Sequence, residues 1–283
     1  MNISLVILSG AMRSGTSVLG KVLGSFDQVE FFYEPMTFVR LLLNKSSHAL
    51  VDDYLYFDLL MPSLAGRNIN LNPHDDSSIH HYKSKAFIEN RLSRSWPSDV
   101  IHEANDNVTC LVKYPSYVNE IADFESKSFP TKKVYIVREP VGNVLSLLRK
   151  KWFSDSVIEG GVRGDFKRVE NRNAPLWLSD QDVDAFFRLN ETGRCLFYYN
   201  KVLGVDLDKY LVVVSYESLC NRPAEAVTNI GRKLGIKAGQ LTDVLVEGMR
   251  PEQIQSLDMT EQNKLVYDEA MWNYKRVLNR VNV

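Results

Sequence analysis

Residues 3–26 read ISLVILSGAMRSGTSVLGKVLGSF, and this stretch decides the fold. It begins with a nearly continuous apolar run of strand length, and residues 10–17 then form a turn that contains two glycines. The apolar residues that follow recur at helical spacing: Val18, Leu19, Val22, Leu23 and Phe26. A turn between a strand and a helix start directs backbone N–H groups and the positive helix end at one spot, which suits a phosphate. The alternative is an ordinary turn that contains two glycines.

Four other short apolar runs resemble the first: residues 29–33, 110–113, 134–137 and 211–214. Such runs suit strands that are buried on both faces, and the segments between them are long enough to hold crossover helices. The sequence therefore predicts an α/β fold, a three-layer sandwich with a central parallel sheet and a P-loop-like phosphate-binding loop.

Apolar periodicity predicts four more helices. The first begins near Pro140. Proline suits the first turn of a helix, because the N–H that it lacks would have no partner within the helix there. Residues 186–203 read as one helix, and another opens at Pro223 and stops at Gly235. The last runs from about Thr260 and is recognised by the apolar residues Leu265, Trp272, Leu278 and Val281.

Two stretches interrupt this pattern. Residues 62–107 are polar and rich in Ser, Asn, His and Asp, and residues 154–175 mix charges with three glycines. Because the β-α pattern resumes after each stretch, we interpret both as insertions that form the substrate side of one domain spanning residues 1–283.

Composition excludes several classes of protein. The chain has 283 residues, of which 45% are apolar, and this argues against disorder. Its 34 basic and 35 acidic residues nearly cancel, so no global field recruits nucleic acid, and any anion site must be local.

Cellular location and metal content follow from what the sequence lacks. Three separated cysteines without a C-x-x-C pair indicate a reducing compartment, and no run reaches the roughly 18 apolar residues of a membrane span. We therefore expect a cytoplasmic protein without an anchor, which leaves a peripheral membrane contact open. The adjacent His80 and His81 lack the i, i+4 spacing of a helical metal site, so no metal is expected.

The turn differs from the ATP and GTP loop G-x-x-x-x-G-K-S/T. Gly10 and Gly15 keep the spacing, but Thr16 occupies the lysine position and Arg13 lies three residues earlier. A triphosphate would lose its usual clamp. A ligand with a 5′-phosphate and no γ-phosphate suits this loop better.

A second anion motif lies in KKVYIVREPVGNVLSLLRKK, residues 132–151. Arg138 ends a strand and Ser146 follows eight positions later, just inside the next helix. From the carboxyl edge of the sheet, a bidentate guanidinium and a hydroxyl can converge on one phosphate. The alternative is a surface arginine in an ion pair and a serine that merely fills the helix.

RSGTS after an apolar strand resembles the 5′-phosphosulfate loop of sulfotransferases that use 3′-phosphoadenosine 5′-phosphosulfate (PAPS). Its arginine form is typical of carbohydrate and tyrosylprotein sulfotransferases. The resemblance covers roughly residues 3–40, 108–152 and 208–236. It implies PAPS as cofactor and 3′-phosphoadenosine 5′-phosphate (PAP) as product, with Arg138 and Ser146 on the 3′-phosphate. It also implies that the loop residues bind the cofactor: Arg13, Ser14, Gly15, Thr16 and Ser17.

The resemblance extends to VVVSYESLCNRPAEAV, residues 212–227, where it implies that Tyr216 approaches the cofactor. Glu217 is interpreted as a structural anchor. Lys150, together with Arg149, is expected at the rim of the 3′-phosphate site.

Sulfuryl transfer needs a base for the acceptor hydroxyl and cations around the transferring group. Glu34 directly follows the run 29–33, and its separation of 21 residues from Arg13 matches the spacing to the catalytic glutamate in the resembling enzymes. We therefore assign Glu34 as the base; the alternative is a strand-end carboxylate paired with Arg40 or Lys113. Arg13 is the candidate cation beside the bridging oxygen.

The resemblance also implies that Lys113 helps to hold the sulfuryl group and that Arg40 contacts the acceptor. No metal is expected, because side chains can neutralise PAP. Tyr82, Trp96 and Trp177 either stack on a sugar or anchor the insertions.

Together these features predict a PAPS-dependent O-sulfotransferase that acts on a hydroxyl of a carbohydrate or glycolipid. The alternatives are a tyrosine acceptor in a peptide, a P-loop small-molecule kinase, which the missing loop lysine disfavours, and a non-catalytic nucleotide-binding module. The sequence leaves the acceptor and the oligomeric state open.

Overall fold

A computed structural model describes residues 2–26, 28–64, 107–161, 166–239, 242, 246, 257 and 260–283. Most of the predicted insertion 62–107 lies outside these residues, as do His80, His81, Tyr82 and Trp96. What the sequence predicts for them stays a prediction.

Five parallel strands form the central sheet in the order β2-β3-β1-β4-β7. They are β1 (Asn2–Gly10), β2 (Val29–Tyr33), β3 (Asn107–Lys113), β4 (Thr131–Val137) and β7 (Val212–Ser215). Each apolar run identified in the sequence lies within one of these strands, apart from Leu211, which directly precedes β7. The predicted α/β fold with a central parallel sheet is confirmed.

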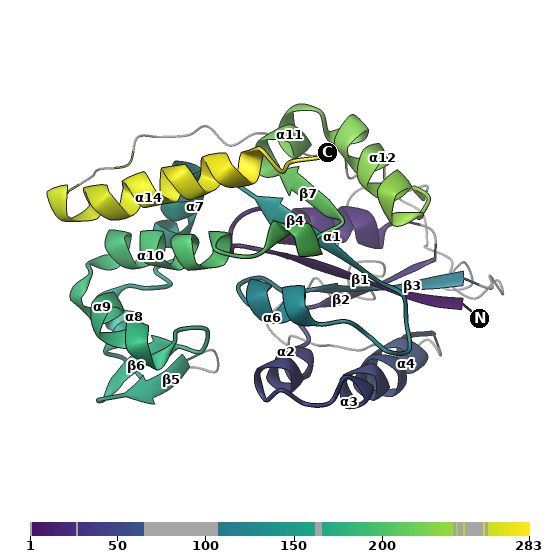
Figure 1. Ribbon diagram of the computed structural model, residues 1–283, viewed down its shortest axis with the longest axis horizontal. Helices are drawn as coiled ribbons and strands as arrows, with labels where there is room; N and C mark the ends of the chain where they lie inside the picture. Colours follow the sequence, from purple (N-terminus) through teal and green to yellow (C-terminus); the bar gives the residue numbers. More distant parts are fainter. Residues whose placement is uncertain are drawn as a thin grey trace, which may run out of the picture.

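Helices cover both faces of the sheet (Figure 1). Val6 and Leu8 of β1 pack against α1 (Thr16–Gly24) and α12 (Pro223–Leu234). The intervening Leu5 and Ile7 face the other side, because successive side chains of a strand alternate. There they pack with α2 (Met36–Leu43), α3 (His48–Asp53) and α6 (Val118–Asp123). The π-helical segment Tyr54–Leu60 and α4 (Met61–Leu64) continue this layer.

Three helices cover β4 on the face opposite α1. Tyr135 and Val137 pack there with α7 (Pro140–Arg149), α10 (Glu191–Leu203) and α14 (Glu261–Leu278). As predicted, α7 begins at Pro140, and α12 begins at Pro223 and ends at Gly235, whose φ of 70° ends the helix in the left-handed region.

The prediction of a single helix over residues 186–203 is wrong. The structure has two helices, α9 (Val183–Arg188) and α10, separated by extended backbone at Leu189. The side chain of Asn190 accepts a hydrogen bond from the backbone N–H of Gly193 at 2.9 Å and so caps α10. Asparagine favours a helix cap over a helix interior, and here the cap prevails over the apolar periodicity.

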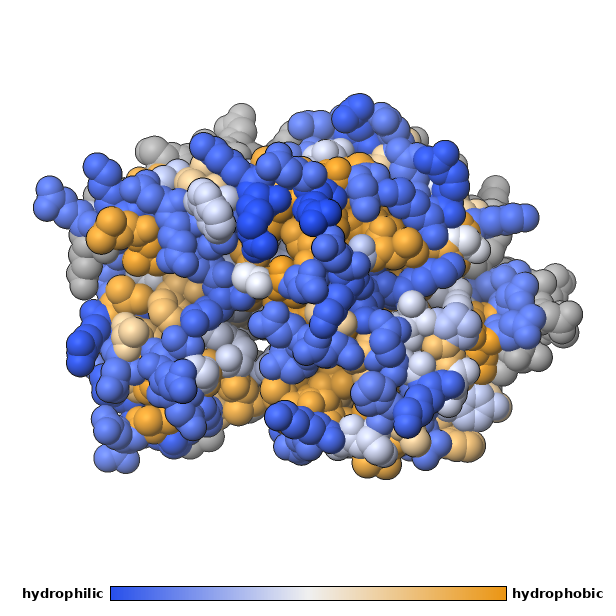
Figure 2. Space-filling view, viewed as in Figure 1, coloured by the Kyte–Doolittle hydropathy of each residue, from blue (hydrophilic) through white to orange (hydrophobic). Residues whose placement is uncertain are grey.

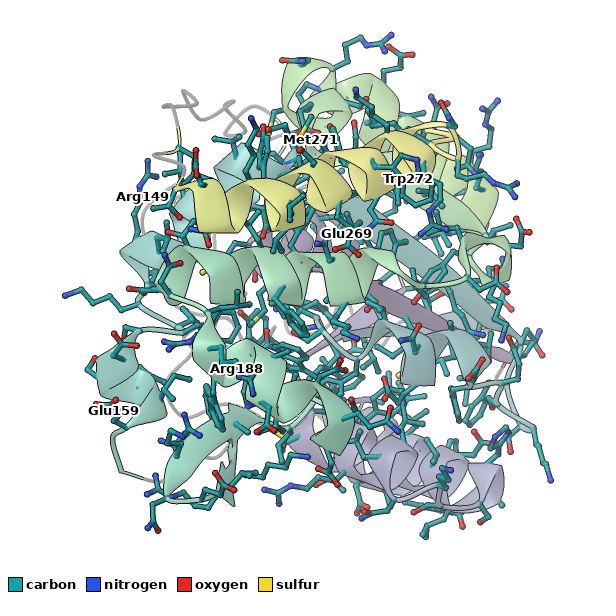
Figure 3. The ribbon with its side chains drawn as sticks, turned by 60° about the vertical axis from the view of Figure 1, so that its left-hand side comes forward. Arg149, Glu159, Arg188, Glu269, Met271 and Trp272 are labelled. Atoms are coloured by element: carbon teal, nitrogen blue, oxygen red, sulfur yellow. The ribbon has the colours of Figure 1, made fainter. Side chains whose placement is uncertain are left out.

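The last helix is confirmed, since α14 begins after Thr260, but its packed face differs from the residues that identified it. Leu265 and Trp272 are 80% and 65% exposed, whereas Ala270, Tyr274 and Val277 are buried. Figure 3 shows Trp272 on this helix. Hydrophilic side chains cover most of the face shown in Figure 2, with separate hydrophobic patches between them.

Residues 154–175 hold a small structure of their own, α8 (Asp155–Ile158) and an antiparallel hairpin of β5 (Phe166–Val169) and β6 (Arg172–Pro175). The buried Asn173 amide donates to the carbonyls of Val157 at 2.7 Å and Gly161 at 2.9 Å, which ties the hairpin to α8. This unit lies beside α9 and away from the sheet (Figure 1).

Short elements join the main ones: helical turns at Asp180–Asp182 and Leu207–Lys209, and α11 (Tyr216–Asn221). Near the C-terminus, Asn282 lies along the outer edge of β7. Its N–H donates to the Val213 carbonyl at 3.0 Å, and its side-chain oxygen accepts from the Val213 N–H at 3.1 Å. All three cysteines are buried and unbridged. No helix in the described part of the chain has the length and apolarity of a membrane span.

Candidate active site

Five residues singled out in the sequence lie at the carboxyl ends of the five strands. Arg13 follows β1, Glu34 follows β2, Lys113 ends β3, Arg138 follows β4 and Tyr216 follows β7. Because parallel strands present these ends at one edge of the sheet, the edge gathers residues that are up to 203 positions apart (216 − 13). This is the edge at which open α/β sheets bind ligands.

The loop between β1 and α1 requires its two glycines. Gly10 and Gly15 have φ of 149° and 92°, which L side chains rarely adopt. A Cβ at Gly10 would lie 2.3 Å from the Ile136 carbonyl oxygen, and one at Gly15 would lie 2.5 Å from the Tyr216 ring. The loop backbone therefore lies tightly on β4 and Tyr216, with Gly15 at the start of α1.

Side chains from two other elements fix this loop. Asn143 of α7 donates to the Met12 carbonyl at 2.8 Å and to the Ser14 hydroxyl at 3.0 Å. Ser14 is fully buried, so its hydroxyl is used inside the protein. Ser17 shares a hydrogen bond with the Tyr33 hydroxyl at 3.1 Å. Contacts from α7 and β2 thus restrict the conformation of this loop.

The second motif lies directly against the loop. Arg138 donates to the Arg13 carbonyl at 3.0 Å, and its guanidinium lies 4.6 Å from the centre of the Tyr216 ring. Arg13 Nε in turn donates to Ser146 Oγ at 3.1 Å. Two guanidinium groups, a hydroxyl and the start of α1 therefore share one small region, and this combination suits phosphate groups.

Glu34 and Lys113 form an ion pair between Oε1 and Nζ. Lys113 is only 1% exposed, and its ammonium lies 4.0 Å from the centre of the Tyr33 ring. The Glu34 N–H also donates to the Lys113 carbonyl at 2.9 Å. The pairing of Glu34 with Lys113, which the sequence offered as the alternative to a catalytic role, is therefore present in the structure. Because the Glu34 side chain remains 29% exposed, the pair presents its carboxylate to the pocket.

Three residues that line the pocket have a left-handed backbone without being glycine: Arg13 (φ 66°), Glu34 (φ 47°) and Ser116 (φ 79°). Such conformations cost on the order of 1 kcal/mol each and persist where the surrounding structure enforces them. Strained residues of this kind often gather at functional sites, so three of them around one pocket make it the candidate site.

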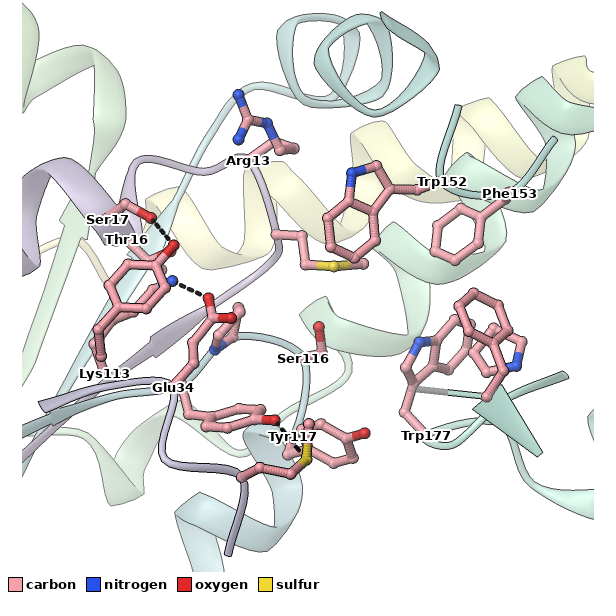
Figure 4. Close-up of a pocket in the computed structure, with 17 residues that line it drawn as sticks. Arg13, Thr16, Ser17, Glu34, Lys113, Ser116, Tyr117, Trp152, Phe153 and Trp177 are labelled. Atoms are coloured by element: carbon pink, nitrogen blue, oxygen red, sulfur yellow. Dashed lines mark hydrogen bonds and ion pairs between the residues drawn. The ribbon is translucent and has the colours of Figure 1, made fainter. Parts of the chain in front are cut away.

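The pocket has a volume of about 450 Å³ (Figure 4). Within the described part of the chain, the charged side chains that line it are those of Arg13, Glu34 and Lys113. The rest of the lining is uncharged and rich in aromatic rings, among them Tyr114, Tyr117, Trp152, Phe153, Phe166 and Trp177. Trp177 was predicted from the sequence, whereas Tyr114, Ser116 and Tyr117 were not. Their position directly after Lys113 at a strand end was the signal that could have identified them.

Two predicted residues lie apart from the cluster. Arg40 is exposed in the last turn of α2 and is not among the residues that line the pocket. Lys150 is exposed at the end of α7, one turn beyond Ser146. Their roles stay predictions. Glu217 is structural, as interpreted, because it accepts from the Glu139 N–H at 2.8 Å and from the Tyr274 hydroxyl at 3.2 Å.

Metal-ligating side chains do not gather in the described ranges, where no three His, Cys, Asp or Glu residues could hold one ion.

Comparison with known proteins gives one family. Residues 6–240 match the family model described as "Sulfotransferase family". Curated protein sequences give no match. Among solved structures, the sulfotransferase domain from the olefin synthase of Synechococcus PCC 7002 is similar over 97% of this chain and 94% of its own, with 16% identity and a TM-score of 0.47.

Two further structures show similarity. The sulfotransferase domain from the curacin biosynthetic pathway has 13% identity and a TM-score of 0.44, over 99% of this chain and 97% of its own. A mouse sulfotransferase complexed with PAP has 11% identity and a TM-score of 0.39, over 96% and 85%.

The close approach at Gly15 predicts that Gly15→Ala lowers the free energy of unfolding by about 1 to 3 kcal/mol, since the methyl group meets Tyr216 at a positive φ. Urea unfolding followed by fluorescence measures this loss. Gly161→Ala is the matched control, because a Cβ there meets no atom within 4 Å. Equal stability of the two variants would contradict the described loop geometry.

Proposed function

This chain belongs to the sulfotransferase family, and we propose that it transfers a sulfuryl group from PAPS to a hydroxyl of a carbohydrate or glycolipid, with Glu34 as the base. The observation that carries the proposal is that the Glu34–Lys113 pair and Arg13 lie in one pocket, beside the glycine-dependent loop between β1 and α1. This loop is called the anion loop below. Transfer to a hydroxyl needs a carboxylate and cations at one point, and this pocket offers them.

The residues present fit PAPS. The loop N–H groups of residues 13 and 15–17 and the start of α1 would hold the 5′-phosphosulfate, and Arg138 and Ser146 would hold the 3′-phosphate. Tyr216 would support the site from beneath the loop, and Lys150 would lie at its rim. When bound, PAPS supplies the sulfuryl group and leaves as PAP.

The protein's own groups divide the chemistry. Glu34 accepts the proton of the acceptor hydroxyl on the carboxylate oxygen that Lys113 does not hold. Lys113 and Arg13 stabilise negative charge at the pocket end of the loop, where the low exposure of Lys113 reduces screening by water. The ion pair with Lys113 holds the Glu34 carboxylate at the strand end, in the pocket lining.

The acceptor proposal rests on the uncharged part of the pocket. Trp152, Phe166 and Trp177 offer flat apolar faces, and the hairpin contributes Phe166 and Pro175 to this wall. Such faces suit the CH face of a neutral sugar ring or the lipid attached to it. A polyanionic glycan or an acidic peptide would need cations beyond Arg13 and Lys113, and no other cation lines the described wall.

Cofactor choice is tested by calorimetry with PAP, AMP and ATP. We expect PAP to bind most tightly, because only PAP offers a 3′-phosphate to Arg138. Arg138→Ala should weaken PAP binding about 10- to 100-fold, as expected for the loss of a charge-assisted contact, and should weaken AMP binding less, because AMP loses only the support that Arg138 gives to the loop. The exposed Arg188→Ala is the control. Equal affinity of the parent for AMP and PAP, or tighter binding of ATP, would exclude this cofactor site.

The base is tested with Glu34→Gln, which should lower turnover about 10²- to 10⁴-fold while PAP affinity stays within twofold. Glu125→Gln is a matched control, since Glu125 forms an ion pair with Lys133, another buried lysine, away from the pocket. That control should keep its turnover. A Glu34→Gln enzyme that turns over normally would rule out Glu34 as the base.

The acceptor class is tested with ³⁵S-labelled PAPS and three acceptor pools: neutral alkyl glycosides such as octyl β-glucoside, tyrosine-containing peptides, and anionic glycans. We expect label in the glycosides, because the CH face of a neutral sugar and its alkyl chain match an aromatic wall and need no further cations. Label in the peptides alone would favour the tyrosine alternative. PAP binding without transfer to any pool, with a silent Glu34→Gln, would favour a non-catalytic module.

A further inference from the structure

Tyr198 joins the anion loop to the turn after β3. It lies on α10, is fully buried, and accepts a hydrogen bond from the Met12 N–H at 2.6 Å. The same phenol oxygen lies 2.8 Å from Ser116 Oγ. Through one side chain, the backbone of the loop is therefore connected to the hydroxyl of Ser116, which lines the pocket and is labelled in Figure 4.

The proton positions in this chain follow from what each group can donate. A phenol has one proton, and the Met12 N–H already uses Tyr198 Oη as an acceptor. Burial raises the pKa of Tyr198 above its ordinary value, so the phenol keeps its proton. Either hydroxyl of the Tyr198–Ser116 pair can donate, and the arrangement that leaves the phenol proton paired has Tyr198 donating to Ser116 Oγ. The proton of the Ser116 hydroxyl is then left to donate elsewhere.

The backbone places the Ser116 side chain in the pocket lining. Ser116 has a left-handed φ of 79°, and its N–H donates to the Gly10 carbonyl at 3.0 Å. Ser116 is partly exposed, whereas Tyr114, Pro115, Tyr117 and Val118 around it are buried. Ser116 lines the same pocket as Glu34 and the aromatic wall. A residue in a strained backbone conformation therefore carries the hydroxyl that this turn contributes to the pocket.

We propose that Ser116 is a further acceptor-binding residue, whose hydroxyl donates a hydrogen bond to an oxygen of the bound acceptor, and that Tyr198 is the positioning residue that orients this donor. The assignment rests on the proposed function of the pocket. It adds a directional polar contact to a wall that is otherwise mostly aromatic, and so fixes which hydroxyl of a ring-shaped acceptor faces Glu34.

Ser116→Gly tests the assignment, because glycine accepts the positive φ and removes only the hydroxymethyl group. The measurement is the calorimetric affinity of the PAP-loaded protein for octyl β-glucoside below its micelle concentration. We expect the affinity to fall roughly 2- to 12-fold, the effect of one hydrogen bond, while the affinity for PAP stays unchanged. Lys45→Gly is the control, since it also places glycine at a left-handed residue (φ 50°) but lies outside the pocket lining.

The outcomes distinguish failure of the Ser116 assignment from failure of the proposed acceptor class. Unchanged glycoside affinity in Ser116→Gly would overturn the role of Ser116 alone. A PAP-loaded parent that binds no glycoside would overturn the acceptor class and this assignment with it, while leaving the cofactor site standing. An equal loss of PAP affinity would show that Ser116 supports the loop instead, which also overturns the assignment.

Tyr198→Phe tests the positioning role. It removes the proton that fixes Ser116 and the acceptor of the Met12 N–H, so we expect weaker binding of both glycoside and PAP. In this background Ser116→Gly should weaken glycoside binding less than it does in the parent, because the two residues act as one unit. Additive effects would show that Tyr198 does not orient Ser116, and thermal melts verify that both variants are folded.

Discussion

The site depends on the contact between Arg138 and the backbone carbonyl of Arg13. Arg138 follows β4, yet its guanidinium donates to the loop after β1 and lies over a ring that follows β7. One side chain therefore joins three strand ends that the sequence separates widely. Without it, the loop would lose one of the contacts that restrict its glycine-containing backbone, and glycine loses more conformational entropy on ordering than other residues.

The ion pair of Glu34 and Lys113 shows that two interpretations of one residue need not compete. The carboxylate is paired, as a structural reading expects, and it also faces the pocket, as a catalytic reading requires. A buried lysine is costly without a partner, so the pair stabilises Lys113 and places the carboxylate at the same time. The left-handed Glu34 is then a conformation that the fold enforces at the end of β2.

Most of the sheet and the anion loop could be predicted from the sequence, because their signals are local. Apolar runs mark buried strands, and Gly10 and Gly15 mark a turn that admits no Cβ. The errors arose where tertiary contacts decide. Asn190 divides a periodic segment by capping α10, and α14 buries Ala270, Tyr274 and Val277 instead of its larger apolar residues. Periodicity counts apolar residues but cannot tell which of two faces the neighbouring helix covers. Ser116 was missed for a similar reason, since the feature that singles it out is its contact with Tyr198, which lies 82 positions away in the sequence.

The two hydrogen bonds between Asn282 and β7 limit the addition of another strand at this edge of the sheet. An outer strand normally leaves a row of N–H and C=O groups that another polypeptide can join, the usual route to edge-to-edge aggregation. At Val213 both groups are already taken, one by the backbone and one by the side chain of Asn282. Asn282 thus occupies the two backbone groups that a sixth strand would pair with at Val213. Another strand could pair with Val213 only after both hydrogen bonds to Asn282 had broken.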